Sequence, residues 1–176
     1  MVALATFALA RRARGFVAPR VRRVHSVRAA ATTTESRFIT DHPDCNVTPY
    51  IADLVGRDLH KIPKHPLNTI KARIEAYFAT LDEDYELFDG EDPIVTTTQC
   101  FDDLNIPPEH PGRSPSDTYY VDAERVLRTH TSAHQSEHLR GGHERFLCTG
   151  DVYRRDEIDA YQAVWIIKDR LCFLEE

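Results

Sequence analysis

The stretch from Leu127 to Gln135, Leu-Arg-Thr-His-Thr-Ser-Ala-His-Gln, joins a predicted strand to a predicted helix. Val126 to Thr131 favours a strand, and Ser132 is suited to the N-cap of a helix that continues through Arg140 and ends at Gly141-Gly142. A strand-to-helix transition presents free backbone N–H groups, and hydroxyl, imidazole and amide side chains accompany them here. The stretch is therefore a candidate ligand site, although a helix cap alone explains Ser132 equally well.

Three histidines in this region follow one another at helical spacing. His130, His134 and His138 are four residues apart, which would place them on one face of a helix. Two histidines at i and i+4 form a common metal-ligand spacing. The H-E-x-x-H order of zinc peptidases is absent, and no carboxylate ligand follows at a known spacing. The alternative is a set of partly exposed helix residues, so we assign no metal ligand.

A second polar stretch, Gly150 to Asp156, reads Gly-Asp-Val-Tyr-Arg-Arg-Asp. An arginine on a strand that also carries apolar residues is costly to bury unless it meets an anion, and its planar donor fork suits a phosphate. Because neighbouring strand residues point to opposite faces, one of Arg154 and Arg155 can face a pocket while the other faces solvent. Two surface salt bridges are the alternative. The Gly-rich phosphate-binding patterns G-x-x-x-x-G-K-[ST] and G-x-G-x-x-G do not occur.

The remaining pattern predicts a mixed fold of helices and strands. An amphipathic helix is expected over 65–78, with Pro66 in its first turn. Its apolar stripe consists of Leu67, Ile70, Ile74, Tyr77 and Phe78. The other expected elements are a short helix at 51–55, strands at 85–88, 94–98, 119–121 and 146–153, and an irregular loop at 105–113. Because the strands follow one another with few crossover helices, we expect an α+β domain with an antiparallel sheet.

Charge is unevenly distributed along the chain. Residues 1–34 contain seven arginines and no acid, which leaves 15 basic against 28 acidic residues in the remainder, within a net charge of −6. This composition predicts an organellar transit peptide, for the mitochondrion or alternatively the plastid. The other interpretation is a disordered tail without a targeting function. The acidic body argues against a nucleic-acid-coating module, and no apolar run is long enough for a transmembrane helix.

Five segments occur in a characteristic order along the chain. They are His65-Pro66-Leu67 with Ile70-Lys71, Pro93 to Thr97, Phe101 to Arg113, Leu127 to Gln135, and Gly150 to Asp156. Together they resemble organellar phenylalanyl-tRNA synthetase of the single-chain, mitochondrial type, over residues 46–159. The resemblance implies a class II synthetase catalytic domain, an antiparallel sheet flanked by helices. It also implies that phenylalanine is activated with ATP to the adenylate and transferred to tRNA(Phe).

The resemblance implies roles for individual residues as well. The implied phenylalanine contacts are His130, Ser132, Ala133, His134 and Gln135. Arg154 matches the catalytic arginine of class II motif 2, which holds the α-phosphate of ATP, and Asp156 stands where the family usually has glutamate. The expected ligands are phenylalanine, tRNA(Phe) and ATP with Mg²⁺. A monomer without a membrane partner is expected, in the mitochondrial matrix or alternatively the plastid stroma.

After Asp159 the sequence departs from the family pattern. We therefore predict a disordered transit peptide at 1–34, the N-terminal part of a class II catalytic domain at 35–159, truncated after motif 2, and a divergent tail at 160–176. We expect no counterpart in this sequence of the later strands of the family's sheet, its motif 3 arginine or its anticodon-binding domain. We expect a truncated gene model that is inactive alone. The alternative is a genuine short paralogue, a catalytically inactive binding or regulatory fragment.

Overall fold

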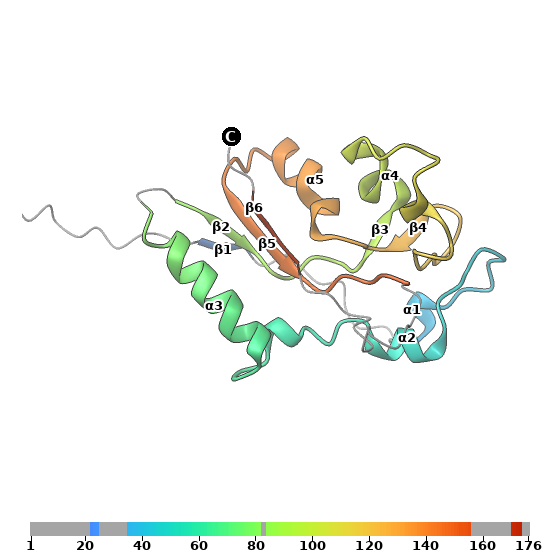
Figure 1. The fold of residues 1–176 in the computed structure, drawn as a ribbon, viewed down its shortest axis with the longest axis horizontal. Coiled ribbons are helices and arrows are strands. Elements are labelled where there is room, and N and C mark those ends of the chain that lie inside the picture. Colours follow the sequence, from blue (N-terminus) through green and yellow to red (C-terminus); the bar gives the residue numbers. More distant parts are fainter. Residues whose placement is uncertain (1–21, 25–34, 82–83, 156–169, 174–176) are drawn as a thin grey trace, which may run out of the picture.

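A computed structural model describes residues 22–24, 35–81, 84–155 and 170–173 (Figure 1). The helices and strands are β1 (Arg22–Val24), α1 (Glu35–Phe38), α2 (Pro49–Leu54), α3 (Pro66–Phe78), β2 (Glu86–Phe88), β3 (Ile94–Thr96), α4 (Thr97–Cys100), β4 (Arg125–Leu127), α5 (Gln135–Arg140), β5 (Phe146–Gly150) and β6 (Arg170–Phe173). The 3-10 helices are η1 (Leu59–Lys61), η2 (Asp102–Leu104), η3 (Pro111–Arg113) and η4 (Thr131–His134). The expected α+β class is confirmed. None of the helices described here has both the length and the apolar character needed to cross a membrane.

The larger sheet is mixed rather than antiparallel. Its strands lie in the order β1-β2-β5-β6, with β1 parallel to β2, β2 parallel to β5, and β6 antiparallel to β5. The antiparallel prediction is therefore wrong for the pairs β1–β2 and β2–β5. Between β2 and β5 the chain passes through β3, β4, η4 and α5, and so long a connection can bring the next strand back in the same direction. β1 falls within the stretch predicted as a leader, and that assignment stays a prediction.

Helices cover both faces of this sheet around its central strand, β5, all of whose residues are buried. Leu87 of β2 and Leu147 of β5 are direct partners, and Phe78 of α3 packs against them on one face. On the opposite face His138 of α5 stacks on Phe88, with ring centroids 3.9 Å apart. Figure 1 shows α3 and α5 on either side of the sheet. A strand enclosed on both faces is expected to be largely apolar, as β5 is apart from the buried Thr149, although it ends at Gly150 rather than at the predicted residue 153.

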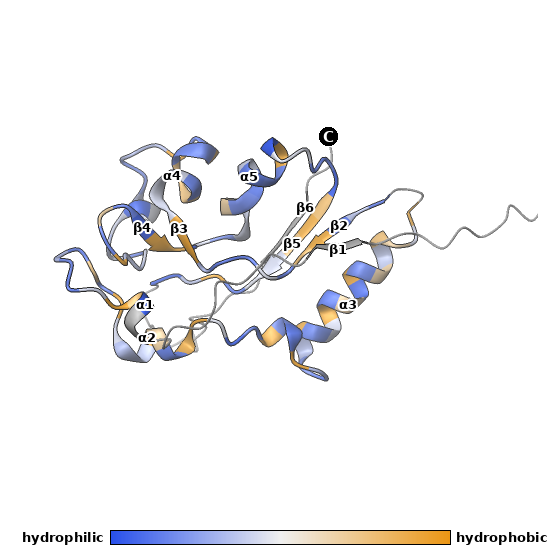
Figure 2. Ribbon diagram, turned by 180° about the vertical axis from the view of Figure 1, so that it is seen from behind, coloured by the Kyte–Doolittle hydropathy of each residue, from blue (hydrophilic) through white to orange (hydrophobic). Residues whose placement is uncertain are grey.

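The strands β3 and β4 form a separate antiparallel pair, which is also covered on both faces. Ile94 and Leu127 are partners in register, and both pack in the hydrophobic cluster that includes α1 and α2. The next pair, Val95 and Val126, packs in the other cluster with Phe101. Figure 2 shows β3 and β5 as largely hydrophobic, whereas α3 alternates hydrophilic and hydrophobic residues. Successive strand residues point to opposite faces, so the two neighbouring pairs pack in different clusters. The alternation in α3 follows instead from the 3.6-residue period of a helix.

The predicted amphipathic helix is confirmed as α3. His65 is its N-cap, and the imidazole Nδ1 accepts a hydrogen bond from the Leu67 N–H at 3.3 Å. Pro66 occupies the first turn, where its missing N–H costs no hydrogen bond because N–H groups in that turn have no acceptor within the helix. The expected apolar stripe is only partly covered by the part of the chain that the structure describes, since Ile70 is 51% and Tyr77 63% exposed.

The strand predicted at 94–98 ends earlier, because Thr96 begins a helix. Its Oγ1 accepts a hydrogen bond from the Gln99 N–H at 3.0 Å, and the Gln99 side chain accepts one from the Thr96 N–H at 2.9 Å. This reciprocal capping box satisfies two N–H groups at the helix start. Thr97 and Thr98 are consequently helical, although their β-branched side chains favoured a strand.

Other predicted elements are shorter or begin elsewhere. The strand expected at 119–121 is reduced to one bridge between Tyr120 and Val126. The loop at 105–113, expected to be irregular, ends in the 3-10 turn η3. Ser132 is not an N-cap, because the 3-10 helix η4 has already begun at the preceding residue.

Lys71 is a buried charge that ties α3 to the sheet. Its ammonium lies 2.9 Å from Asp89 Oδ2, just after β2, and 2.7 Å from Glu75 Oε1, one turn along the helix. Lys71 is 5% and Asp89 8% exposed, so water contributes little to stabilising either charge. A buried ammonium of this kind is tolerated only beside its carboxylate partners.

Replacing Lys71 by methionine is expected to lower the free energy of unfolding by roughly 3–5 kcal/mol, because the buried Asp89 carboxylate loses its counter-charge. Denaturant unfolding measures the difference. The matched control is Lys64→Met, which alters an exposed lysine and should change the free energy by less than about 0.5 kcal/mol. Equally small losses in both variants would contradict the role assigned to Lys71.

Candidate functional site

The candidate ligand stretch divides into buried and accessible side chains. Ala133 is 1% exposed and packs in the cluster beneath β3 and β4, and His134 is 4% exposed. His130, Ser132 and Gln135 are half-buried. Of the five residues predicted to contact phenylalanine, these three are accessible to a ligand, whereas the other two lie inside the fold.

Arg128 connects this stretch to the second polar stretch. Its side chain is almost fully buried, at 3% exposed. The guanidinium Nε donates to the backbone carbonyl of Asp151 at 2.8 Å, and Nη1 lies 3.4 Å from the carbonyl of Glu91 and 3.2 Å from Nε2 of His134. Three separate segments therefore converge on one cation, which is tolerated inside the protein because acceptors surround it.

His134 is held neutral by these surroundings. Burial, the Arg128 charge and His138 lower the pKa of His134 from its ordinary value of 6.5 to about 3. The geometry agrees, because a guanidinium offers only donors, so the Nε2 atom that faces it must accept and carry no proton. The side chain predicted to complete the phenylalanine site thus serves as a hydrogen-bond acceptor for the buried arginine.

Glu91 lies between two of the predicted histidines. Its carboxylate oxygens are 3.4 Å from Nε2 of His138 and 3.9 Å from Nδ1 of His134. Burial raises the pKa of Glu91, and the Arg128 charge opposes that shift. Burial also lowers the pKa of His138 to about 4, with His143 acting in the same direction and Glu86 against it.

The predicted single face of histidines is therefore only partly formed. The His134 and His138 rings are 6.3 Å apart, whereas His130 precedes η4 and its Nε2 lies 4.0 Å from the Cys100 thiol. Burial raises the pKa of Cys100, so this thiol is not an activated nucleophile. No metal ligand set was predicted from these histidines, and within the described residues the metal-compatible cluster lies elsewhere.

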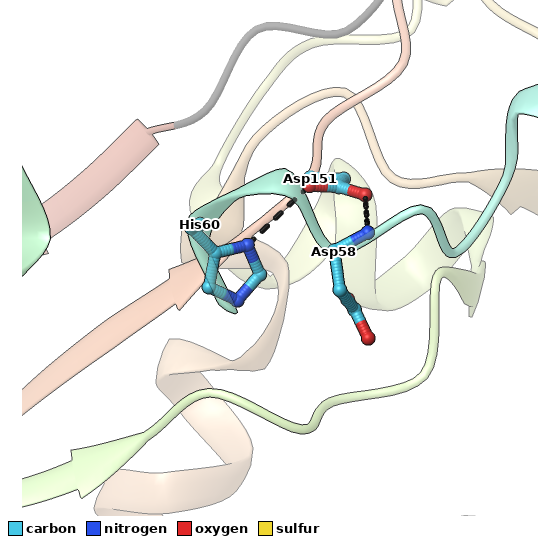
Figure 3. Close-up of side chains that lie close together, drawn as sticks. All are labelled: Asp58, His60 and Asp151. Atoms are coloured by element: carbon cyan, nitrogen blue, oxygen red, sulfur yellow. Dashed lines mark hydrogen bonds and ion pairs between the residues drawn. The ribbon is translucent and has the colours of Figure 1, made fainter. Parts of the chain in front are cut away.

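That cluster consists of Asp58, His60 and Asp151, whose candidate ligand atoms lie within 4.8 Å of one another (Figure 3). Nδ1 of His60 is 3.4 Å from Oδ1 of Asp151, and the Asp58 backbone N–H donates to Oδ2 of Asp151 at 2.9 Å. The Asp58 carboxylate accepts a hydrogen bond from Lys61 at 3.1 Å. The Asp151 carboxylate is thus contacted by groups of the protein itself, which favours a structural role over a metal site.

The predicted anion-binding arginine is at the surface. Arg154 and Arg155 are both exposed, and among the described residues Arg154 has no ion-pair partner. Arg155 donates from Nη1 to the Pro115 carbonyl at 2.7 Å. Asp156, predicted to lie in the ATP site, is outside the described residues. The argument that a strand arginine must meet buried acceptors applies to Arg128 rather than to these two.

Sequence reasoning missed the residues that join the two stretches. Arg128 follows two apolar strand residues, and that position was a signal for burial. Asp151 precedes the buried Val152 and Tyr153, so its own burial was also foreseeable. Glu91 carried no such signal, because an acid in a polar stretch between two strands is ordinarily solvated.

The sequence matches the family model described as tRNA synthetases class II core domain (F) over residues 49–165. It is 52% identical over 121 residues to a chloroplastic/mitochondrial phenylalanine–tRNA ligase of Arabidopsis thaliana, covering 68% of this chain and 28% of the relative. It is 48% identical over 119 residues to a mitochondrial phenylalanine–tRNA ligase of Dictyostelium discoideum, covering 65% and 26%. A phenylalanine–tRNA ligase alpha subunit of Mycoplasmoides gallisepticum is 37% identical over 117 residues, covering 60% and 34%. The chain thus spans about a third or less of the length of these relatives.

Gly150→Ala is expected to destabilise the protein by about 1–3 kcal/mol, as overpacking does. A Cβ at this position would lie 2.0 Å from Nη2 of Arg128, whose buried side chain has no room to withdraw. Thermal and denaturant unfolding provide the measurement. In an Arg128→Met background the same change should cost much less, and purely additive losses would refute the steric explanation.

Acidification should destabilise the protein through His134 and His138. Both have folded-state pKa values below the ordinary 6.5, so the unfolded chain binds protons more readily. Their contribution is complete above about pH 6.5 and is lost as the pH falls towards 4 and then 3, at up to about 1.4 kcal/mol per pH unit for each group.

The variant His138→Phe keeps an aromatic ring against Phe88 but cannot bind a proton. Urea unfolding of both proteins between pH 7 and pH 4 isolates its share of the pH dependence. The stability of the variant should fall less steeply over this range. Parallel curves would contradict the neutral state assigned to His138.

Proposed function

The chain belongs to the family of class II tRNA synthetase core domains (F), and on this basis we propose that it is part of an organellar phenylalanine–tRNA ligase. The observation that carries the proposal is the 52% identity over 121 residues to a ligase of that kind. We further propose that its two sheets, flanked by helices, belong to the class II catalytic domain.

The proposed reaction has two steps. The carboxylate of phenylalanine attacks the α-phosphorus of ATP, which forms phenylalanyl-adenylate and releases pyrophosphate. The phenylalanyl group then passes to the 3′ end of tRNA(Phe), and AMP leaves. The first step needs no side-chain base, because the attacking carboxylate is already an anion. The protein must instead hold two anions in line and offset the charge that develops on the phosphoryl group.

The accessible polar side chains of the candidate stretch suit the amino-acid substrate. His130, Ser132 and Gln135 are half-buried at the start of η4 and α5, and we propose that they contact phenylalanine. Ala133 and His134 would support this site from within, since one packs in the core and the other accepts a hydrogen bond from Arg128.

Arg154 suits the nucleotide. It is exposed, and its cation has no ion-pair partner among the described residues, so it is available to the α-phosphate. We propose Asp156 as a second residue of the ATP site, by its place in the motif. Magnesium would arrive with ATP, whose phosphates supply most of its ligands. The Asp58, His60 and Asp151 cluster does not fit that ion, since its two innermost side chains are 1% and 0% exposed and face one another.

Location and assembly are proposed on separate grounds. The acid-free, arginine-rich residues 1–34 and the organellar names of the relatives support a mitochondrial matrix protein, with the plastid stroma as the alternative. The partners would be phenylalanine, ATP and tRNA(Phe), and the resemblance to the single-chain, organellar type supports a monomer.

Arg154→Ala is expected to lower kcat for phenylalanine-dependent ATP–pyrophosphate exchange about 10²–10³-fold in the full-length protein, because it removes a donor that stabilises the developing charge. The control Arg155→Ala changes the neighbouring exposed arginine, whose guanidinium donates to a backbone carbonyl, and should alter kcat only slightly. Circular dichroism checks that both variants are folded. Unchanged exchange in Arg154→Ala would refute the assignment. Absence of exchange in the unaltered full-length ligase, of which this chain is proposed to be a part, would refute the function.

A further inference from the structure

A loop at residues 56–60, called the 56–60 loop below, holds the segment that follows β5. The Gly56 N–H donates to the hydroxyl of Tyr153 at 3.1 Å, and the Asp58 N–H donates to Oδ2 of Asp151 at 2.9 Å. Two loop residues that are two positions apart thus bind the side chains of two segment residues that are also two positions apart. Both acceptors are 0% exposed, so these donors replace the water that the acceptors would otherwise bind.

His60 completes this contact. Its Nδ1 lies 3.4 Å from Oδ1 of Asp151 (Figure 3), and its side chain is 1% exposed. The backbone carbonyl of His60 accepts a hydrogen bond from the Asn68 side chain at 2.9 Å, which fixes the loop to α3. A carboxylate without access to water is stable only where donors surround it, so the 56–60 loop determines where Asp151 can lie.

The backbone of the loop is shaped for this contact. Gly56 has φ 76° and Asp58 has φ 48°, both in the left-handed region. That region is uncommon for a residue other than glycine, although aspartate tolerates it better than most. Figure 3 shows the Asp58 carboxylate turned away from Asp151, so its backbone rather than its side chain makes the contact.

The far edge of the same segment is also fixed. The Tyr153 N–H donates to the Arg128 carbonyl at 2.9 Å, and the Arg155 N–H donates to the Asp117 carbonyl at 3.0 Å. Arg154, between these two anchored residues, is exposed. The side-chain contacts with the 56–60 loop and these two backbone contacts together fix the backbone from which Arg154 extends.

We propose that His60 and Asp151 are positioning residues for Arg154, which set the place of its guanidinium relative to the α-phosphate of ATP. The inference rests on the proposed function, because the position of the Arg154 guanidinium affects the reaction only if this group binds the phosphate. Neither residue touches the substrate, and both act through the segment that carries the arginine. A displacement of about 1 Å in such a group is enough to cost about a hundredfold in rate.

The test measures phenylalanine-dependent ATP–pyrophosphate exchange in the full-length protein with ATP and phenylalanine varied separately. His60→Leu removes the imidazole and is expected to lower kcat/KM for ATP tenfold or more, with KM for phenylalanine changed by less than about twofold. His60→Asn retains a side-chain donor and should restore most of the loss. The control His42→Leu alters an exposed histidine and should leave both constants unchanged. If His60→Leu does not fold, the isosteric variant Asp151→Asn takes its place.

A double-mutant cycle with Arg154→Ala separates positioning from general stability. A residue that acts through Arg154 loses its effect once that side chain is gone, so His60→Leu should change kcat/KM by less than about twofold in this background. An equal fall in both backgrounds overturns the proposal. The proposal is also overturned if His60→Leu only reduces the amount of folded enzyme, while the molecules that remain folded keep the KM for ATP of the unaltered protein.

Failure of the proposed function gives a different result. If the unaltered protein shows no exchange, calorimetric titration with ATP decides the matter without turnover. Weaker ATP binding in His60→Leu, but not in the double variant, would support positioning of a nucleotide-binding arginine. Unchanged ATP affinity, or no ATP binding by the unaltered protein, would overturn it.

Discussion

The buried guanidinium of Arg128 is the constraint on which the central part of the structure depends. Arginine cannot lose its charge inside a protein, so it can be enclosed only where acceptors are ready for it. The carbonyls of Asp151 and Glu91 and the ring of His134 supply them. These groups come from three different parts of the chain, so enclosing one cation obliges all three to meet. Gly150 is needed for the same reason, since any larger residue would occupy the space of the guanidinium.

The two candidate halves of the site are therefore set by a shared support. Arg128 contacts His134 in the stretch that contains Ser132 and Gln135, and it contacts Asp151 in the segment that carries Arg154. The 56–60 loop then fixes the outer edge of that segment through Asp151. The interior provides placement, and the accessible side chains remain available for substrates. Such a division suits a reaction in which two bound anions must be aligned.

Much of this architecture was predictable where local signals agree. Periodicity and Pro66 identified α3, and a mostly apolar run identified β5. The capping box at Thr96 was legible in the sequence, but the β-branched threonines after it favoured a strand. The parallel pairing of β2 with β5 and the contact between the 56–60 loop and Asp151 were not predictable. Asp58 and Asp151 are 93 residues apart, and local sequence preferences do not predict which distant donor will bind a buried carboxylate.

The parallel pairing of β2 with β5 also bears on how the chain reaches this state. Glu86 lies beside Phe146, so the intervening chain must close into a loop before either strand gains a partner on that edge. Helix α3 needs only neighbouring residues and can form far sooner. For some interval the apolar residues Leu87 and Leu147 are then both exposed to water. Refolding should consequently be slow for a chain of this size, and a chaperone that shields apolar segments would matter more during that interval than afterwards.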